Sequence, residues 1–406
     1  MSEKIDNEMT TDMLEQQLNN EINREENSLW YNTTIGLKET KLIIKTITPC
    51  IKALISGCPL KLVFGKKDDY LCIGVRIFDI LNSPLFISKV QYKSEEHKAL
   101  IYALQEGRFD ISLLNEMDKL LAWSKVTISE EKALDVLNWM QDESSLYAGT
   151  RTKKVDYAHD CFCVSVESTY KHKFPNAHTI PYIELETTID SWNTMELYFY
   201  SDQNIYNFNI QDRDEGGTFE KEIASALTSV FPSTLYRNPK FRKGTNDKEL
   251  TDILAFYKYG SFLIEAKEIS IIDSSFDRSK TRRILKIQNK VKQAIKQMAG
   301  ATKVFMKGTE IYTSNNEKIN VNRIQPPHCI ILITEFMHDG DWSEVQNLLF
   351  NAINETGAMF NIMDFGEFIE LLKASSGKPE IIDYNLMQRW KCLMKNHSIH
   401  VKGTYE

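Results

Sequence analysis

Three side chains within residues 251–268 are of types and at a spacing that could act together on a substrate: Asp252, Glu265 and Lys267. The stretch is otherwise apolar and rich in β-branched and aromatic residues, so it is predicted to form two strands that bend at Gly260. With a two-residue turn just before this glycine, Asp252 lies directly opposite Glu265. Side chains alternate along a strand, so Lys267 shares the face of Glu265. The sequence therefore predicts two carboxylates and an ammonium group together at the open end of a hairpin.

This arrangement of charges suits a cation site. Two carboxylates directly opposite each other across a strand pair repel, and a divalent cation with oxygen ligands is the natural group to hold them together. Ligation by oxygen atoms alone favours Mg²⁺ or Mn²⁺ over zinc. In a plainer interpretation, Glu265 and Lys267 lie on a solvated face, while Phe262, Ile264 and Ala266 face the core. The hairpin by itself does not decide between these alternatives.

Length and composition are those of a globular protein. The chain has 406 residues, enough for two domains, with 42% hydrophobic and 26% charged residues. No run approaches the roughly 18 apolar residues of a membrane-spanning helix, and the acidic N-terminus lacks the apolar core of a secretory signal. Seven cysteines without regular spacing are typical of free thiols in a reducing compartment. We therefore expect a cytoplasmic protein with no membrane partner.

Charge is strongly segregated along the chain. Residues 1–30 hold eight acidic residues against Lys4 and Arg24, whereas residues 278–307 hold ten Lys or Arg and no Asp or Glu. A basic surface beside a cation site suits a polyanion such as nucleic acid, and the alternative is a solvated helix face. The side chains expected to contact nucleic acid are Arg278, Lys280, Arg282, Arg283, Lys286 and Lys290.

Breaks in the hydrophobic pattern divide the chain into four parts. Residues 1–28 form an acidic arm, and residues 29–210 form an α+β domain that we expect to recognise a target or bind a partner protein. The polar segment 211–217, which ends in two glycines, is the predicted boundary. Residues 211–375 form the domain that carries the hairpin, and residues 376–406 form a C-terminal extension.

After this boundary, the predicted elements alternate between helix and strand. A helix over 218–230, capped by Thr218, precedes a short strand near 234–236 and then the hairpin. The remaining predictions are a basic helix over 279–298, a strand over 329–336, a helix over 342–354, a strand over 359–363 and a helix over 365–374. The order α-β-β-β-α-β, extended by α-β-α, indicates an α/β fold in which helices flank a mixed sheet.

In this element order, residues 216–375 resemble the PD-(D/E)XK nuclease superfamily, which has the restriction-endonuclease-like fold. The resemblance is carried by Asp252 on the second core strand and by the sequence Glu-Ala-Lys at 265–267 on the third. Thr251 stands where the family motif has proline, a departure that many members share. The resemblance implies a mixed sheet flanked by helices and a metal-dependent site at the open end of the hairpin.

The resemblance also implies a role for each site residue. The implied metal ligands are Glu220, Asp252, Glu265 and the backbone carbonyl of Ala266, and the implied catalytic residues are Asp252, Glu265, Lys267 and Gln297. Lys267 would orient or deprotonate the attacking water, and Gln297 would position Lys267 or a phosphate. Glu222 is the alternative to Glu220 on the preceding helix, and Gln293 is the alternative to Gln297.

These features together predict a Mg²⁺-dependent nuclease that hydrolyses phosphodiester bonds, of DNA in preference to RNA. The resemblance implies a role in restriction or anti-phage defence. The alternative from another class is a non-catalytic nucleic-acid-binding or assembly module on the same fold. A homodimer or a partner protein bound through the N-terminal domain is also expected, because two strands cut by one site per chain favour a dimer.

Two other groups of residues could carry chemistry. His159, Cys161, Cys163, His172 and His178 fall within twenty residues and could hold zinc. However, no Cys-x-x-Cys pair is present, and the apolar alternation over 161–168 instead predicts a strand with buried cysteines. The aromatic run 197–200 could stack on bases, although a strand core accounts for it better.

Overall fold

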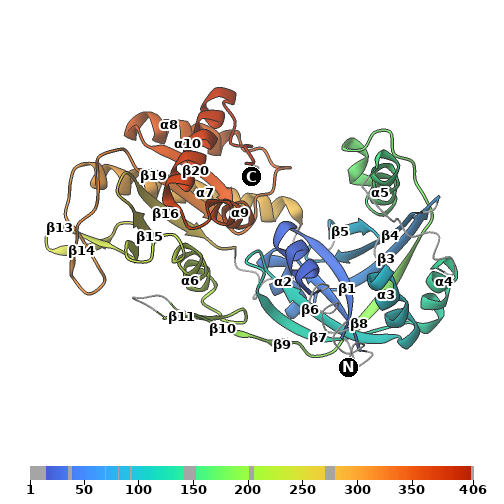
Figure 1. Ribbon diagram of the computed structural model, residues 1–406. Coiled ribbons are helices and arrows are strands. Elements are labelled where there is room, and N and C mark those ends of the chain that lie inside the picture. Colours follow the sequence, from blue (N-terminus) through green and yellow to red (C-terminus); the bar gives the residue numbers. More distant parts are fainter. Residues whose placement is uncertain are drawn as a thin grey trace. The chain divides into compact units, whose positions relative to one another are not determined.

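Two compact units make up the protein, one ending at Met195 and the other beginning at Glu196. The sequence placed the break later, at 211–217. The difference arises because the hairpin of β10 (Glu196–Tyr200) and β11 (Ile205–Asn209) packs through β11 on the first helix of the second unit. The computed structural model (Figure 1) describes residues 15–34, 39–68, 70–80, 82–91, 94–140, 152–200, 205–269 and 279–403.

The first unit is built on one mixed sheet, in the order β1-β2-β6-β7-β8-β3-β4-β5, with β9 paired to β7. Only β2 and β6 run parallel among its described pairs. Its strands are β1 (Ser28–Thr34), β2 (Glu39–Lys45), β3 (Leu60–Lys67), β4 (Tyr70–Ile77), β5 (Leu85–Val90), β6 (Arg108–Leu114), β7 (Leu120–Ile128), β8 (Tyr182–Ile189) and β9 (Asn193–Thr194). Its helices are α2 (Thr48–Ile55), α3 (Ser94–Glu106), α4 (Glu130–Met140), α5 (Lys153–Val166) and the 3₁₀ helix η2 (Ser168–His172), and residues 15–24 are also helical.

One prediction for this unit is wrong, because residues 161–168 belong mainly to helix α5 and not to a strand. The side chain of Thr152 caps this helix by accepting a hydrogen bond from the backbone N–H of Val155. Val155, Phe162 and Val166 then recur at helical spacing and pack into one buried cluster. The short alternation at Cys161 is therefore overridden by a longer helical pattern.

The second unit contains the predicted α-β-β-β-α-β order, which is confirmed (Figure 1). Its central sheet has the order β12-β15-β16-β19-β20, in which β16, β19 and β20 run parallel. The bounds are α6 (Glu215–Leu227), β12 (Leu235–Arg237), β13 (Lys240–Lys243), β14 (Asn246–Glu249), β15 (Ile253–Phe256), β16 (Ser261–Lys267), α7 (Lys280–Met306), β17 (Ile311–Tyr312), β18 (Lys318–Ile319), β19 (His328–Ile333), α8 (Ser343–Thr356), β20 (Met359–Asp364), α9 (Phe365–Ser375) and α10 (Pro379–Asn396).

Helices cover both faces of the central sheet. The Thr302 hydroxyl of α7 lies 3.1 Å from the Cys329 thiol of β19, which places α7 on the face that bears Cys329. Leu263 pairs with Cys329 in the parallel register, so Glu265 and Lys267, two and four residues further along β16, point to the same side. The opposite face is packed by α6, α9 and α10.

Three elements of this unit differ from the sequence prediction. Helix α6 begins at Glu215, because the Asp214 carboxylate caps it by accepting a hydrogen bond of 3.0 Å from Gly217 N–H. Strands β13 and β14 were not predicted. Together with β17 and β18 they form a small four-stranded sheet in the order β14-β13-β17-β18. The predicted C-terminal extension contains α10, whose buried Arg389 donates to Glu367 of α9 at 2.9 Å and to the carbonyl of Ile362 at 2.7 Å.

The remaining composition-based expectations can be compared with the structure. All seven cysteines are free thiols and six are buried, as predicted. Across the described ranges, none of the helices combines the length and apolarity that spanning a membrane requires.

Candidate active site

The hairpin of β15 and β16 has the predicted register. Ile253 pairs with Ile264. In the same register, Asp252, which immediately precedes β15, lies opposite Glu265 of β16. The turn closes where the N–H of Tyr257 donates to the carbonyl of Gly260 at 2.9 Å. Tight closure leaves a single register available, because a shift by one residue would turn every core side chain to the wrong face.

Asp252 is fixed from two sides. Its backbone carbonyl accepts a hydrogen bond of 2.8 Å from the N–H of Asn238, which follows β12. Its side-chain Oδ2 accepts a hydrogen bond of 2.7 Å from the N–H of Ala266. The neighbouring Thr251, in the position of the motif proline, donates its hydroxyl to the carbonyl of Ile264 at 2.7 Å and is buried. Thr251 therefore helps to hold the two strands together at the site.

Glu265 and Lys267 are in direct contact. The Lys267 ammonium lies 2.9 Å from Oε2 of Glu265 and 3.8 Å from Oδ2 of Asp252. Burial and the nearby Asp252 carboxylate raise the pKa of Glu265 to about 7, although Lys267 opposes the shift. Burial alone would lower the pKa of Lys267, but the charges of Glu265 and Asp252 raise it. The three groups therefore interact strongly, and one ammonium does not offset both carboxylates.

Two further residues reach this site from other elements. Glu220 of α6 interacts with the charges of both Asp252 and Lys267, and burial followed by Asp252 raises the pKa of its carboxyl group. Arg237 of β12 lies 3.3 Å from Oε2 of Glu220. The alternative, Glu222, lies two residues on and is buried. The predicted helical carboxylate is thus brought to the triad, together with an arginine that sequence reasoning had not selected.

Glu249 is a site residue that sequence reasoning missed. It is the last residue of β14, and its carboxyl group lies within hydrogen-bonding reach of that of Asp252. Partial burial and the charges of Asp252 and Glu220 raise the pKa of Glu249 to about 7. The charged sequence around Gly244 shows no apolar alternation, so its only signal for the hairpin that delivers Glu249 is the glycine itself, which adopts a φ of +67° in the structure.

Gln297 is exposed on α7, and among the described residues no hydrogen bond links its side chain to Lys267. Lys290 lies seven residues earlier on the same helical face, and its ammonium donates to the carbonyl of Glu268 at 2.6 Å, just beyond β16. The glutamine that α7 does bury is Gln288, which donates to the carbonyl of Asp341 at 2.8 Å.

Much of the basic segment is neutralised within the second unit. Acidic side chains of residues 335–355 pair with cations of α7 along its length. The pairs are Lys280 with Asp339, Arg283 with Glu335 at 2.7 Å, Lys292 with Glu344 at 2.8 Å and Lys303 with Glu355 at 2.7 Å. Arg282 is exposed and Lys286 is half-buried, while Arg278 lies outside the described residues.

The donor atoms at the site fit a hard divalent cation. Within the described ranges, no group of three or more His, Cys, Asp or Glu side chains converges on one point that could hold an ion. The set that the resemblance implies combines Glu220, Asp252 and Glu265 with the backbone carbonyl of Ala266, and its three carboxylates are among the groups that do not converge on one point. These are oxygen donors with excess negative charge, which suits Mg²⁺ or Mn²⁺. Lys267 must turn away from Glu265 for this carboxylate to bind the ion.

The second cluster of the first unit does not converge. Cys163 Sγ lies 3.7 Å from His159 Nε2, but Cys161 instead accepts a hydrogen bond from the backbone N–H of His178. His172 lies in η2 and is exposed. Among the described residues, no three His, Cys, Asp or Glu side chains of this cluster converge on a point that could hold a metal ion.

The aromatic run 197–200 is only half strand core. Tyr198 and Tyr200 are 51% and 75% exposed on one face of the hairpin, whereas Phe199 stacks on Phe208 with ring centroids 5.5 Å apart. The expected strand is confirmed, and its core character holds for alternate residues only. A two-stranded sheet buries one of its faces on α6 and leaves the other exposed, so alternate residues have opposite surroundings.

Comparison with known proteins identifies the part of the chain that holds this site. Residues 215–329 match the nuclease-related domain family, a range that runs from the start of α6 into β19. No curated protein and no solved structure matched the chain. The match includes Glu220, Asp252, Glu265 and Lys267, and the fold around them has the predicted α-β-β-β-α-β order. Residues 215–329 are therefore a nuclease-related domain of the PD-(D/E)XK type.

Proposed function

We propose that the protein is a metal-dependent nuclease that hydrolyses phosphodiester bonds, of DNA in preference to RNA. The observation that carries the proposal is the convergence of Asp252, Glu265 and Lys267 inside a nuclease-related domain. A purely structural ion pair would match charges, whereas here two carboxylates face one ammonium and the pKa of Glu265 is raised. Clusters of this kind, in which burial and like charges shift a pKa, are typical of functional sites.

The proposed metal ligands are Asp252, Glu265 and the carbonyl of Ala266, with Glu220 reaching the site from α6. A bound Mg²⁺ supplies positive charge that lowers the pKa of water and offsets charge on the phosphate. Asp252 is already oriented for this role, because its Oδ2 is tied to the N–H of Ala266. Its other oxygen, Oδ1, is the one we expect to face the ion.

Lys267 and Arg237 are the cations proposed to act on the phosphodiester. Lys267 is held by carboxylates in the metal-free protein, and its pKa is raised, so it carries its proton at neutral pH. With Glu265 as a metal ligand, the Lys267 ammonium would donate to a phosphate oxygen or orient the attacking water. Arg237, which now pairs with Glu220, would contribute a guanidinium that suits a phosphate.

The further roles rest on the resemblance and, for α7, on the charge of the basic segment. We propose that the enzyme acts in restriction or defence against foreign DNA, and that the first unit recognises the target or a partner. Exposed cations of α7, Arg282 above all, would contact the nucleic-acid backbone. Gln297 would reach Lys267 or a phosphate only once substrate is bound.

A cleavage assay tests the proposal directly. The full chain is incubated with plasmid, linear DNA and RNA in Mg²⁺, Mn²⁺ or EDTA. We expect cleavage of DNA with either ion, none with EDTA and none for Asp252→Asn or Glu265→Gln. Glu355→Gln, which changes an exposed carboxylate on α8, is the matched control and should cleave as the unaltered protein does. Metal-independent nucleic-acid binding without cleavage would instead support the non-catalytic module.

A further inference from the structure

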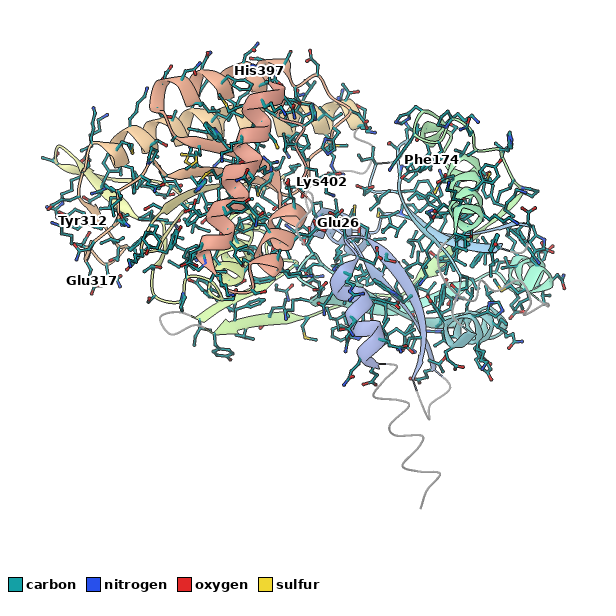
Figure 2. The ribbon with its side chains drawn as sticks, turned by 45° about the horizontal axis from the view of Figure 1, so that its top comes forward. Glu26, Phe174, Tyr312, Glu317, His397 and Lys402 are labelled. Atoms are coloured by element: carbon teal, nitrogen blue, oxygen red, sulfur yellow. The ribbon has the colours of Figure 1, made fainter. Side chains whose placement is uncertain are left out.

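Two histidines from distant parts of the second unit face each other. His338 follows β19 and His400 follows α10, and their Nδ1 atoms are 3.2 Å apart. Both side chains are exposed to solvent. In Figure 2, the labels of His397 and Lys402 mark the chain on either side of His400. The proposed nuclease function uses neither histidine.

Aromatic packing holds both imidazole rings in place. The Phe336 ring lies 4.7 Å from that of His338 and 5.6 Å from that of His400, measured between centroids. The indole of Trp342 stacks on Phe336, with ring centroids 4.6 Å apart. This indole is buried, and its N–H donates to the carbonyl of Met337 at 2.9 Å. The two rings therefore rest on a fixed aromatic support.

The backbone that carries His400 is also tied down. Arg389 of α10 donates to the carbonyl of Val401 at 2.7 Å, and the N–H of Gly403 donates to the Glu367 carboxylate at 2.9 Å. The N–H of His400 itself donates to the Ser398 hydroxyl at 3.1 Å. A ligand that binds both histidines would therefore pay little to order this segment.

The separation of the two nitrogens matches that of two ligands on one ion. Zinc binds imidazole nitrogen at about 2.0–2.1 Å, so two such nitrogens at a tetrahedral centre are about 3.3 Å apart. The observed 3.2 Å is therefore close to the separation that two ligands of one ion require. Without metal, the same distance is that of a hydrogen bond from one Nδ1–H to the other Nδ1.

Partial burial and neighbouring charges act on both imidazole rings. Partial burial and the nearby Lys402 lower the pKa of His338, while Asp339 and Glu367 oppose this shift. Burial and the neighbouring His338 lower the pKa of His400. Neutral imidazole is the form that binds a metal.

We propose that His338 and His400 bind a transition-metal ion of the zinc type through their Nδ1 atoms, separately from the carboxylate site. Imidazole ligands suit Zn²⁺, whereas Mg²⁺ prefers oxygen ligands. No third His, Cys, Asp or Glu in the described ranges is placed to join them, so water completes the coordination. The ion would join the C-terminal segment to the loop that holds Glu335 and Asp339, the partners of Arg283 and Lys280 on α7.

Zinc binding to the full chain tests this proposal. Asp252→Asn with Glu265→Gln serves as the background, so that the carboxylate site does not compete for the ion. Calorimetric titration with ZnCl₂ and thermal unfolding with and without zinc are then compared for His338→Ala and His400→Ala. We expect one equivalent of zinc to bind and to raise the unfolding temperature. Each histidine variant should bind zinc more weakly by roughly tenfold or more. Even the loss of a group that only hydrogen-bonds to a metal ligand lowers metal affinity by about this factor.

His397→Asn is the matched control. His397 is exposed near the same end of the chain and has a φ of +47°, a conformation that asparagine tolerates. This variant should bind zinc as the background protein does. Zinc affinity unchanged in either His338→Ala or His400→Ala, or absence of zinc binding by the background protein, would overturn the proposal. Nuclease assays in Mg²⁺ report separately on the carboxylate site.

Discussion

The side chain of Asp252 accepts a hydrogen bond of 2.7 Å from the backbone N–H of Ala266, the residue between Glu265 and Lys267. This bond links the acid before β15 to the centre of the motif on β16. It fixes the orientation of the Asp252 carboxylate, whose neighbours also include Lys267 and Glu249. The bond also determines how Asp252 should be replaced. Alanine at this position would leave the N–H of Ala266 unpaired at a part-buried position, whereas asparagine keeps an oxygen that can accept the bond.

Replacing the triad should abolish cleavage without unfolding the protein. Asp252→Asn, Glu265→Gln and Lys267→Met should each lower the cleavage rate by about 10²-fold or more, because each removes a charge that acts on the reacting groups. In the absence of metal, the two carboxylate variants should keep or slightly raise the unfolding temperature, because a repulsion is relieved. Cleavage gels and thermal unfolding measure the two effects. Unfolded variants would show that the triad is structural.

The stability of the metal-free protein should fall as pH rises through neutrality. The pKa of Glu265 is raised to about 7 in the folded state, so the folded protein binds this proton more tightly than the unfolded chain. The stabilisation is therefore complete below the unfolded pKa near 4.5 and is lost as pH rises toward 7. At about 1.4 kcal/mol per pKa unit, it reaches at most about 3 kcal/mol.

Denaturant unfolding in EDTA at several pH values, compared with Glu265→Gln, measures this dependence. The difference in unfolding free energy between the two proteins should change between pH 5 and pH 8, in favour of the unaltered protein at the lower pH. Added Mg²⁺ should stabilise the unaltered protein more at pH 8 than at pH 6, because the ion competes with the proton. A difference that does not vary with pH would mean that Glu265 has an ordinary pKa.

Glu220→Gln should reduce cleavage more than Glu222→Gln. Glu220 interacts with Asp252 and Lys267, whereas Glu222 is buried within the packing of α6. The variant of Glu222 should therefore lower the unfolding temperature and leave cleavage by the remaining folded protein intact. Rates are compared per folded molecule, from the amplitude of the unfolding transition. The reverse order of effects on cleavage would remove Glu220 from the site.

Glu249→Gln should weaken cleavage, though less than Asp252→Asn does. Glu249 lies beside Asp252, so we expect it to support this ligand and its loss to cost roughly tenfold in Mg²⁺ affinity. Asp247→Asn is the matched control on the same strand, since its carboxylate instead pairs with exposed Arg242 at 3.6 Å. The Mg²⁺ dependence of the cleavage rate gives the Mg²⁺ affinity of each of the two variants. An equal affinity in the two variants would exclude Glu249.

Arg282→Ala should weaken nucleic-acid binding and reduce its salt dependence. Each phosphate contact that is lost lowers the slope of log affinity against log salt by about 0.9 for duplex DNA. Lys303→Ala is the control, because Lys303 pairs with Glu355 at the other end of α7. Arg283→Ala is expected to lower stability instead, because it would remove the part-buried ion pair with Glu335. An unchanged salt slope for Arg282→Ala would place the nucleic-acid surface elsewhere.

Local sequence patterns are sufficient to predict the hairpin and the positions of its three charged groups. Two strands joined by a tight turn at Gly260 pair locally, so alternation alone predicts that Asp252 lies opposite Glu265. The order of helices and strands from α6 to α9 was also predictable, because each element is long enough to show its own period. The strands of the β13–β14 hairpin could not be predicted in this way, since they are short and largely charged.

Only the tertiary structure decided which groups neighbour these residues. The basic segment is free of acids along the chain, yet Lys303 meets Glu355, 52 residues later, because α8 packs against α7. In the same way, Glu249 and Arg237 join the site through strand pairing, and His338 meets His400 through the return of the C-terminal segment. Electrostatic interactions depend on distance in space, and a count of charges along the chain does not contain that distance.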